Sequence, residues 1–358
     1  MKCTYPDYYR NFRCIADKCP DTCCAGWEIV VDEESAEKYR LADGEIGKKL
    51  RSSMTVDSDG DTVFISQNRR CPFLLGNNLC EIYIELGEKS LCRTCTLFPR
   101  HITDLGSRKE TGISVSCPEA ARLIFSSDEP ITFETVDEDV PIQPNDIDPT
   151  TYFILQKAQK TAINILQNRK FPLNLRLIAF LRFCEDIQKK IRSADIGEIS
   201  VGDEYFLPVA PSEAQAKRTL NRYAALLISL EKLNPEWAQE LEASRKHCKL
   251  RYPTEAEHLA VYFAFRYFMT AAFDGNILSK AKFVVFSVIS CMMLTAELPD
   301  RQDKAERTEA YRRYSKEVEH SAENMSSVFS AIKKSRCFGS DNLINILSSD
   351  YLPKEKQK

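Results

Sequence analysis

The sequence is poor in glycine and histidine for its length. It contains 12 glycines and 4 histidines in 358 residues. Neither a Gly-x-Gly-x-x-Gly segment nor a Walker loop occurs, which argues against a nucleotide-binding fold built on glycine-rich loops. Serine-hydrolase and His-Glu-x-x-His patterns are missing too. Four scattered histidines argue against catalysis centred on histidine.

The chain also lacks a charge excess and a targeting segment. Its 49 basic and 52 acidic residues give a net charge of -3, so nothing favours a nucleic-acid or membrane partner. The first ten residues contain no apolar core of a signal peptide, so we expect a cytoplasmic protein. The longest apolar run, 283–296, is shorter than a membrane span and predicts a buried helix instead.

Cysteine is the residue type in excess, with 14 in the chain. Ten of them lie in the first 117 residues, so the cysteine density belongs to one region. The other four, and Cys3, are expected to be small buried side chains without a chemical role. Those four are Cys184, Cys248, Cys291 and Cys337.

The densest stretch is 12–27, which holds Cys14, Cys19, Cys23 and Cys24 within eleven residues. Neighbouring Cys23 and Cys24 are poor disulfide partners for each other, and two unstrained disulfides are hard to form in so short a loop. In a cytoplasmic protein, clustered thiols are typical of metal sites or catalysis. The loop therefore predicts a soft metal ion or an iron–sulfur cluster.

A second block of thiols follows about fifty residues later, and it includes the pair Cys92-x2-Cys95. Zinc and a [4Fe–4S] cluster each take four such ligands. The nine candidate metal ligands allow two four-thiol sites, or one site with structural thiols; disulfides and inert thiols are the weaker alternatives. The nine are Cys14, Cys19, Cys23, Cys24, Cys71, Cys80, Cys92, Cys95 and Cys117.

The predicted fold class is α+β, with a small cysteine-rich metal-binding domain followed by a mostly all-α domain. The first domain spans 1–127 and the helical one 151–358. Between them, 128–150 is acidic and rich in proline, as expected of a linker or an extended crossing segment. Apolar periodicity predicts a helix in 33–50 and the following helices after the linker: 150–169, 173–194, 212–233, 235–247, 254–273, 277–297, 303–320 and 321–335.

Several short motifs in the first 125 residues together resemble the bacterial flagellin lysine-N-methylase family. That family is part of a wider group of zinc- or iron-chelating proteins, whose cysteine signature has shorter spacings than this chain has. The helical half is similar only in length and character. The motifs are Phe12-x-Cys14-x4-Cys19-Pro-Asp-Thr-Cys23-Cys24-x-Gly-Trp27, Cys71-Pro-Phe-Leu, Leu79-Cys80-x-Ile82-Tyr83, Leu91-Cys92-x2-Cys95, Phe98-Pro-Arg100 and Ser116-Cys117-Pro-Glu.

The resemblance implies an enzyme that methylates lysine side chains of flagellin. It implies S-adenosylmethionine as methyl donor and an iron–sulfur cluster as metal centre, with zinc as the alternative. A non-catalytic metal-binding interaction module and an iron–sulfur redox protein are the other functions that the cysteines allow. The sequence does not identify a catalytic base. Four carboxylates close to cysteines could act as a base or bind the cationic lysine, although solvated side chains or helix starts are the favoured interpretation: Asp21, Glu28, Glu81 and Glu119. His101 could be an extra metal ligand, but a surface position is favoured for it.

Overall fold

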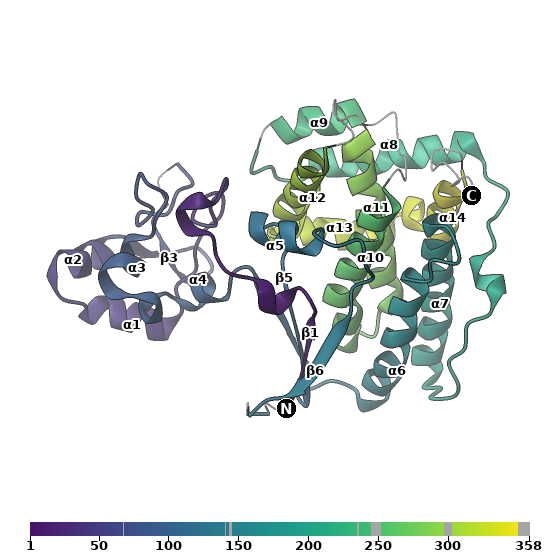
Figure 1. The fold of residues 1–358 in the computed structure, drawn as a ribbon, viewed down its shortest axis with the longest axis horizontal. Helices are drawn as coiled ribbons and strands as arrows, with labels where there is room; N and C mark the ends of the chain where they lie inside the picture. The colour runs from purple at the N-terminus through teal and green to yellow at the C-terminus, as the bar shows by residue number, and fades with distance from the viewer. Residues whose placement is uncertain are drawn as a thin grey trace.

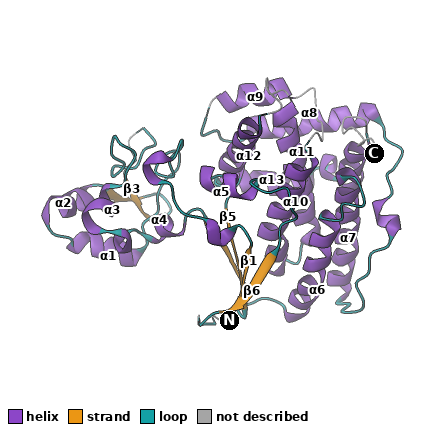
Figure 2. Ribbon diagram, in the orientation of Figure 1, coloured by secondary structure: helices purple, strands orange, loops and turns teal. Residues whose placement is uncertain are grey.

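The structure, a computed structural model, describes residues 1–66, 68–139, 141–142, 145–234, 236–244, 252–296 and 303–349. Helices dominate, and a small sheet accompanies them (Figure 2). The predicted mixture of α and β structure is confirmed. Cys248 lies outside the described residues.

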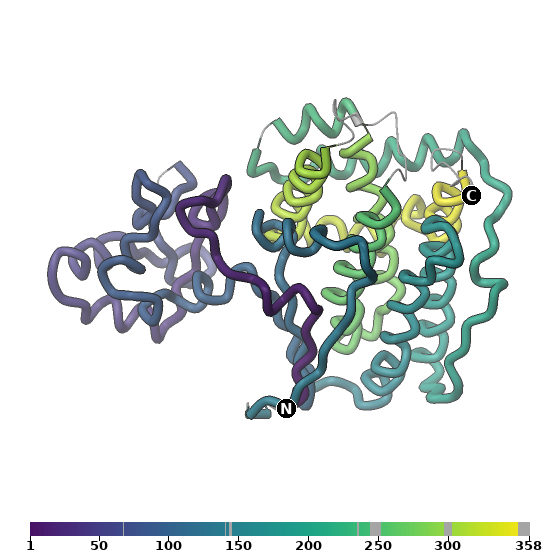
Figure 3. Tube along the Cα trace, in the orientation of Figure 1, coloured from purple at the N-terminus to yellow at the C-terminus, as the bar shows by residue number. Residues whose placement is uncertain are grey.

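A four-stranded sheet links the two ends of the cysteine-rich region. Its order is β4-β5-β1-β6, in which β1 runs parallel to β5 and antiparallel to β6. β4 and β5 form a hairpin that turns at Gly106, whose φ of +79° suits glycine. The first strand therefore lies inside the sheet (Figure 3). The strands are β1 Lys2–Pro6, β4 Arg100–Asp104, β5 Arg108–Ile113 and β6 Phe133–Asp137.

The smaller elements between β1 and β4 surround an apolar cluster of their own. Its buried members include Tyr39, Phe64 and Phe73, and Cys92 is among them. We call residues 27–97 the cysteine lobe; Figure 1 shows it beside the helical body. Its elements are α1 Glu33–Leu41, α2 Gly44–Ser52, β2 Met54–Val56, β3 Thr62–Phe64, α3 Glu81–Leu86 and α4 Arg93–Leu97.

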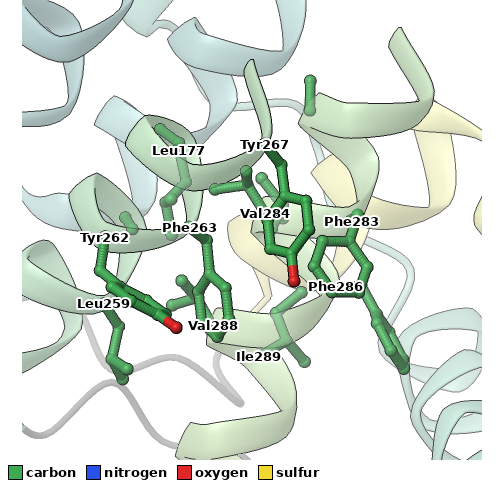
Figure 4. Packing of buried hydrophobic residues seen from close by; sticks show 14 of the residues in the cluster. Leu177, Leu259, Tyr262, Phe263, Tyr267, Phe283, Val284, Phe286, Val288 and Ile289 are labelled. Carbon is green, nitrogen blue, oxygen red and sulfur yellow. The ribbon is translucent and has the colours of Figure 1, made fainter. Parts of the chain in front are cut away.

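The rest of the chain packs around a second, larger cluster. The long helices α7 and α11 contribute to it, and Phe263 of α10 packs against Phe283 of α11 (Figure 4). Phe286 of α11 packs against Tyr223 and Phe338 instead. The helices are α5 Pro118–Ile124, α6 Pro149–Leu166, α7 Leu173–Ser193, α8 Glu213–Ser229, α9 Glu236–Ser244, α10 Pro253–Tyr267, α11 Ile277–Ala296, α12 Lys304–Val318, α13 Ala322–Lys334 and α14 Ser340–Ser348.

Helix α11 is long and apolar enough to cross a membrane, but 83% of its most apolar window is buried inside the structure. It is longer than the 283–296 run suggests, because Ile277 and Ala281 extend its buried face. Within the described residues it is the single helix that passes this test. Burial on all sides is what the sequence predicts for this segment.

The two apolar clusters do not follow the predicted domain boundaries. Tyr8, Phe12 and Phe125, all within 1–127, pack into the larger cluster with the helices. The segment 128–150 is not only a connection, because β6 pairs with β1 along its whole length. An edge strand tolerates the prolines around it, since they lie outside the paired residues. Whether 1–127 and 151–358 are separate domains stays a prediction.

Candidate functional site

The cysteine-rich loop meets the cysteine lobe along two short extended segments. The Cys71 amide donates to the Cys24 carbonyl oxygen at 2.8 Å, and the Gly26 amide donates to the Arg69 carbonyl oxygen at 2.8 Å. An isolated bridge pairs Ala25 with Arg70. These contacts bring together the opening loop and the second block of cysteines, as the sequence predicts they must.

Three of the predicted ligands precede short helices at the N-cap position. They are Cys80 before α3, Cys92 before α4 and Cys117 before α5. Burial raises the pKa of Cys117 to about 11, although backbone amides of the next turn act in the opposite direction. Amides at a helix start favour a thiolate over a thiol. Each of these sulfurs can therefore serve as an anionic ligand once a cation compensates for burial.

The nine thiols gather in one neighbourhood. Burial and the nearby sulfurs of Cys24, Cys80 and Cys92 raise the pKa of Cys71 to about 12. The Cys23 thiol lowers the pKa of Cys24 to about 7 by hydrogen bonding, against the effect of burial. The Cys92 and Cys95 side chains are paired in the same way, as their i, i+3 spacing at the start of α4 allows.

The nine divide by neighbour into two sets. Burial first, and then the sulfurs of Cys19 and Cys14, raise the pKa of Cys117. Cys23 has both Cys14 and Cys117 nearby. Cys24 instead has the sulfurs of the cysteine lobe as neighbours. Cys23 therefore belongs to a set of thiols around the opening loop, and its neighbour Cys24 belongs to a set in the cysteine lobe.

The donor chemistry fits a soft metal ion or a cluster, because thiolates are the ligands that these centres take. In the described part of the chain, however, no three Cys, His, Asp or Glu side chains are arranged to hold one metal ion. The side chains are gathered but do not converge on a common point. The identity of the ligands therefore stays a prediction.

The opening loop is fixed to α12 through Asp21. Its Oδ2 accepts hydrogen bonds from Arg312 Nη1 and from Lys316 Nζ, both at 2.7 Å. Burial favours a higher pKa for Asp21, but the Lys316 ammonium and the Arg312 guanidinium outweigh it and keep the pKa below its ordinary value. Asp21 is therefore an ion-pair partner at neutral pH, and it lacks the proton affinity of a general base.

Of the other three carboxylates near cysteines, one is exposed and two are partly buried in ion pairs. Glu28 is exposed. Glu81 pairs with Lys49, and Glu119 pairs with Arg122 at 2.7 Å in the first turn of α5. Glu28 therefore matches the prediction of a solvated side chain, whereas Glu81 and Glu119 match the prediction of helix starts.

The prediction that His101 lies at the surface is wrong. His101 is on β4, where its ring lies against Tyr262 and Phe265, and its Nε2 is buried without a hydrogen-bond partner. The residue opposite it on β5 is Gly112, at which a Cβ would lie 2.5 Å from His101 Nε2. The missing side chain at Gly112 therefore lets the ring turn inward.

A buried polar cluster next to the loop was not apparent from the sequence. Glu319 accepts hydrogen bonds from Tyr267 Oη at 2.8 Å and Ser315 Oγ at 2.5 Å, and its carboxylate pairs with Arg266 Nη1 at 3.2 Å. Tyr262 Oη donates to the same carboxylate at 3.2 Å. These residues come from α10 and from the end of α12, which the sequence marks only as helices with apolar faces.

His320 extends this cluster to the cysteine-rich loop. Its Nε2 lies 2.8 Å from both Ser114 Oγ and Ser116 Oγ, next to Cys117 in the chain. Burial, together with the charges of Arg266 and Lys316, lowers the pKa of His320 to about 3. The imidazole is therefore neutral at physiological pH, and its ring stacks on Trp27 at 5.4 Å between centroids.

A cavity of about 240 Å³ lies on the helical body, lined by none of the nine candidate metal ligands; the one cysteine in its lining is Cys337. Three exposed arginines line it, Arg218 and Arg222 from α8 and Arg336 from the segment before α14. It shares no residue with the loop, the lobe or the polar cluster. It is therefore a separate feature of the fold.

Comparison with known proteins identifies the helical part of the chain. Residues 159–346 match the family model described as the FliB lysine N-methylase C-terminal domain. Two proteins named lysine-N-methylase, from Salmonella choleraesuis and Salmonella typhimurium, are each 25% identical over 211 residues, which is 55% of this chain and 50% of theirs. The flagellar biosynthetic protein FliU of Salmonella muenchen is 28% identical over 135 residues, 34% of this chain and 76% of that protein. No solved structure matches.

Proposed function

The chain belongs to the FliB lysine N-methylase family, and from this membership we propose that it is a protein-lysine N-methyltransferase. The match over 159–346 carries the proposal, because it covers the helical half. The resemblance seen in the cysteine motifs points to the same family from the other half. The chain spans about half the length of the two lysine-N-methylases that it matches.

We propose flagellin as the methyl acceptor, in the cytoplasm. The names of the relatives support this, since two are lysine-N-methylases and a third is a flagellar biosynthetic protein. The near-balanced charge of the chain favours a protein substrate over nucleic acid. S-adenosylmethionine is the proposed methyl donor, which follows from the family resemblance.

The methyl-transfer reaction sets the requirements that the enzyme must meet. A lysine ammonium has an ordinary pKa of about 10.4 and must lose a proton before its nitrogen can attack a methyl carbon. In the transfer, the new bond forms between nitrogen and methyl carbon, and the sulfonium–methyl bond breaks to leave a neutral thioether. The protein has to hold both groups in line and bury the amine.

A metal centre is the second part of the proposal. A [4Fe–4S] cluster, with zinc as the alternative, would be held by Cys14, Cys19, Cys23 and Cys117, or by four of the five sulfurs of Cys24, Cys71, Cys80, Cys92 and Cys95. What supports this is the gathering of nine thiols and the soft character of thiolate ligands. Such a centre would supply structural rigidity or a redox-active site.

A direct assay tests the methylase. Purified chain is incubated with flagellin and S-adenosylmethionine, and flagellin peptides are analysed by mass spectrometry. We expect additions of about 14 Da, the mass of one CH₂, on lysine residues. The informative variant is Glu319→Gln, in which the buried cluster of Tyr262, Tyr267 and Arg266 loses its carboxylate. Glu306→Gln, at an exposed position on α12, is its control. Unmodified flagellin beside intact metal content would instead favour a non-catalytic interaction module.

Metal analysis of anaerobically purified protein tests the centre. We expect brown protein that contains iron; colourless protein with stoichiometric zinc would rule out the cluster. Each of the nine cysteines is then replaced by serine in turn, with the buried Cys184→Ser as a matched control. Loss of metal in four replacements and not in the control would identify the ligands, and unchanged metal in all nine would reject the assignment. Iron with redox activity but no methyl transfer would favour a redox protein.

A further inference from the structure

A lysine of the chain itself is held inside the cysteine-rich motif. Lys316, from α12, directs its Nζ to Asp21 Oδ2 at 2.7 Å and lies 5.3 Å above the centroid of the Trp27 ring. Its side chain is 14% exposed. One ammonium group therefore has a carboxylate and an aromatic face as its neighbours, which are the two partners that bind a lysine head group most favourably.

The loop is shaped around the alkyl part of this lysine. Gly26 has a φ of +103°, and a Cβ built there would lie 3.4 Å from Lys316 Cε. A larger residue at this position would be strained and would crowd the lysine chain. Gly26 stands directly before Trp27, so the contact belongs to the same turn that presents the indole.

The indole is fixed by two further rings. Phe98 lies 5.3 Å from Trp27 and His320 lies 5.4 Å from it, and the Phe98 and His320 rings are 5.7 Å apart. Two serines hold the His320 ring in place through its Nε2. A fixed, uncharged aromatic support keeps the indole face available without adding a positive charge beside an ammonium.

We propose that Asp21 and Trp27 form the binding site for the head group of the substrate lysine, and that Lys316 occupies this site in the free protein. The inference rests on the proposed methylase function. The site suits both substrate and product, because a methylated ammonium keeps its charge and is bound by an aromatic face. Lys316 thus acts as an internal competitor that the substrate lysine must displace.

Displacement of Lys316 does not leave Asp21 without a partner. Arg312 Nη1 also contacts Asp21 Oδ2 at 2.7 Å, and its side chain is only 8% exposed. Removing every partner from a partly buried carboxylate is costly, so a second cation makes an exchange of lysines feasible. Arg312 is held in turn by Glu309 at 2.6 Å.

The alternative is that Lys316 only ties α12 to the loop. Acetylation of the lysines in the full-length chain distinguishes this alternative from the proposed binding site. The experiment is done with and without an added probe, N-acetyl-dimethyllysine methylamide. The probe is cationic, and its tertiary amine forms no stable amide with the reagent. Its control is N-acetylnorleucine methylamide, which has no charge. Peptide mass spectrometry follows acetylation of Lys316, with the exposed Lys217 on α8 as the internal reference.

We expect acetylation of Lys316 to rise severalfold as the cationic probe is added, towards the rate of Lys217, and not to rise with the uncharged control. Trp27→Leu should abolish this dependence on the probe. Lys316 acetylation that is equal with and without the probe would overturn the inference, even if flagellin is methylated. A clear rise in acetylation without any methyl transfer to flagellin would keep the site and reject the proposed function.

Lys316→Met offers a second measurement, because methionine keeps the length of the side chain without the charge. The variant should bind the cationic probe several times more tightly than the unchanged chain, as judged by tryptophan emission. Lys217→Met is the matched control and should bind as the unchanged chain does. Equal binding by the Lys316 variant and the control would show that Lys316 does not compete for the site.

Discussion

A single buried carboxyl group on the sheet gives the fold a pH-dependent stability. Glu110 lies on β5, where it is 1% exposed, and its Oε2 accepts a hydrogen bond from Gln159 Nε2 at 2.9 Å. Burial raises the pKa of Glu110 to about 7, although Arg108, 2.9 Å away, and Gln159 act in the opposite direction. Folding therefore favours the protonated form.

The sign of the effect follows from proton binding. Between the ordinary pKa of 4.5 and about 7, the folded chain holds a proton at Glu110 that the unfolded chain releases. The contribution of Glu110 to the free energy of unfolding thus decreases as the pH rises through this window, by roughly 3 kcal/mol at most, and is level above it. Denaturant titrations at pH 5 and pH 8 measure the difference.

Glu110→Gln keeps the shape and removes the titration. The variant should lose part of this pH dependence and gain stability relative to the unchanged chain at pH 8. Glu34→Gln, at an exposed position on α1, is the control and should change neither value. An equal pH dependence in the unchanged chain and the Glu110 variant would contradict the assignment.

At the residue scale, sequence reasoning identified the cysteines but missed the polar groups beside them. Clustering along the chain marks thiols directly, whereas Ser114 meets His320, and Glu319 meets Tyr267, only after distant segments have packed. In the sequence, the pair of serines before Cys117 was the one indication of these polar groups. His101 was misjudged because its inward position depends on Gly112, a residue on a different strand.

At the scale of elements, Asp32 joins two helix starts of the cysteine lobe. Its Oδ1 accepts from the Ser35 amide at 3.1 Å in the first turn of α1, and its Oδ2 accepts from the Arg93 amide at 2.7 Å, where α4 begins. Cys92 and Cys95 lie at the start of α4. One side chain therefore orders both a helix and the pair of cysteines.

Asp32→Ala should reduce the stability of the lobe by about 1–2 kcal/mol, because a lost N-cap costs about this much and two helix starts are affected. It should also increase the accessibility of Cys92 and Cys95 to a thiol reagent. Asp303→Ala, which removes the cap of α12 outside the lobe, is the matched control. Equal cysteine labelling in the two variants would show that Asp32 does not position α4.

Helices were predicted far better than strands, for a physical reason. The apolar period and the caps of a helix lie within a few residues, so α6, α7 and α11 begin and end close to the predicted bounds. Strand β1, in contrast, depends on partners about a hundred residues away or more, as Lys2 and Arg108 are. Such pairing leaves no local pattern in strands of five or six residues.

One predicted helix is broken in the structure. The segment 33–50 forms α1 and α2, because Gly44 takes a φ of +74° and turns the chain after Ala42. A Cβ at Gly47 would lie 1.9 Å from the Ala42 carbonyl oxygen, so the close turn needs glycine there as well. Apolar periodicity continues across the break and hides it. Helix α14 was missed altogether.

For the whole molecule, two apolar clusters of unequal size predict unequal local stability. The cysteine lobe has the smaller cluster, while the sheet, the first strand and the helices share the larger one. Hydrogen exchange should therefore show the amides of α1 and α3 opening together, at a lower free energy than the amides of α7 and α11. Mass spectrometry of peptides measures both sets in one sample.

A chelator sharpens this comparison. If the lobe cysteines hold a metal, its removal should speed exchange in α3 and α4 and leave α11 unchanged, since ligand binding stabilises only the part that it contacts. Helix α11 is the internal control. Uniform exchange across α1, α3, α7 and α11 would show that the chain opens as one unit.

The inner position of β1 has a consequence for the order of events during synthesis. β1 leaves the ribosome before its neighbours β5 and β6, which follow only about a hundred residues later. At roughly 5–20 residues per second, the strand waits on the order of ten seconds for a partner. The whole cysteine lobe emerges in that interval, so it can fold, and meet metal, before the sheet closes behind it.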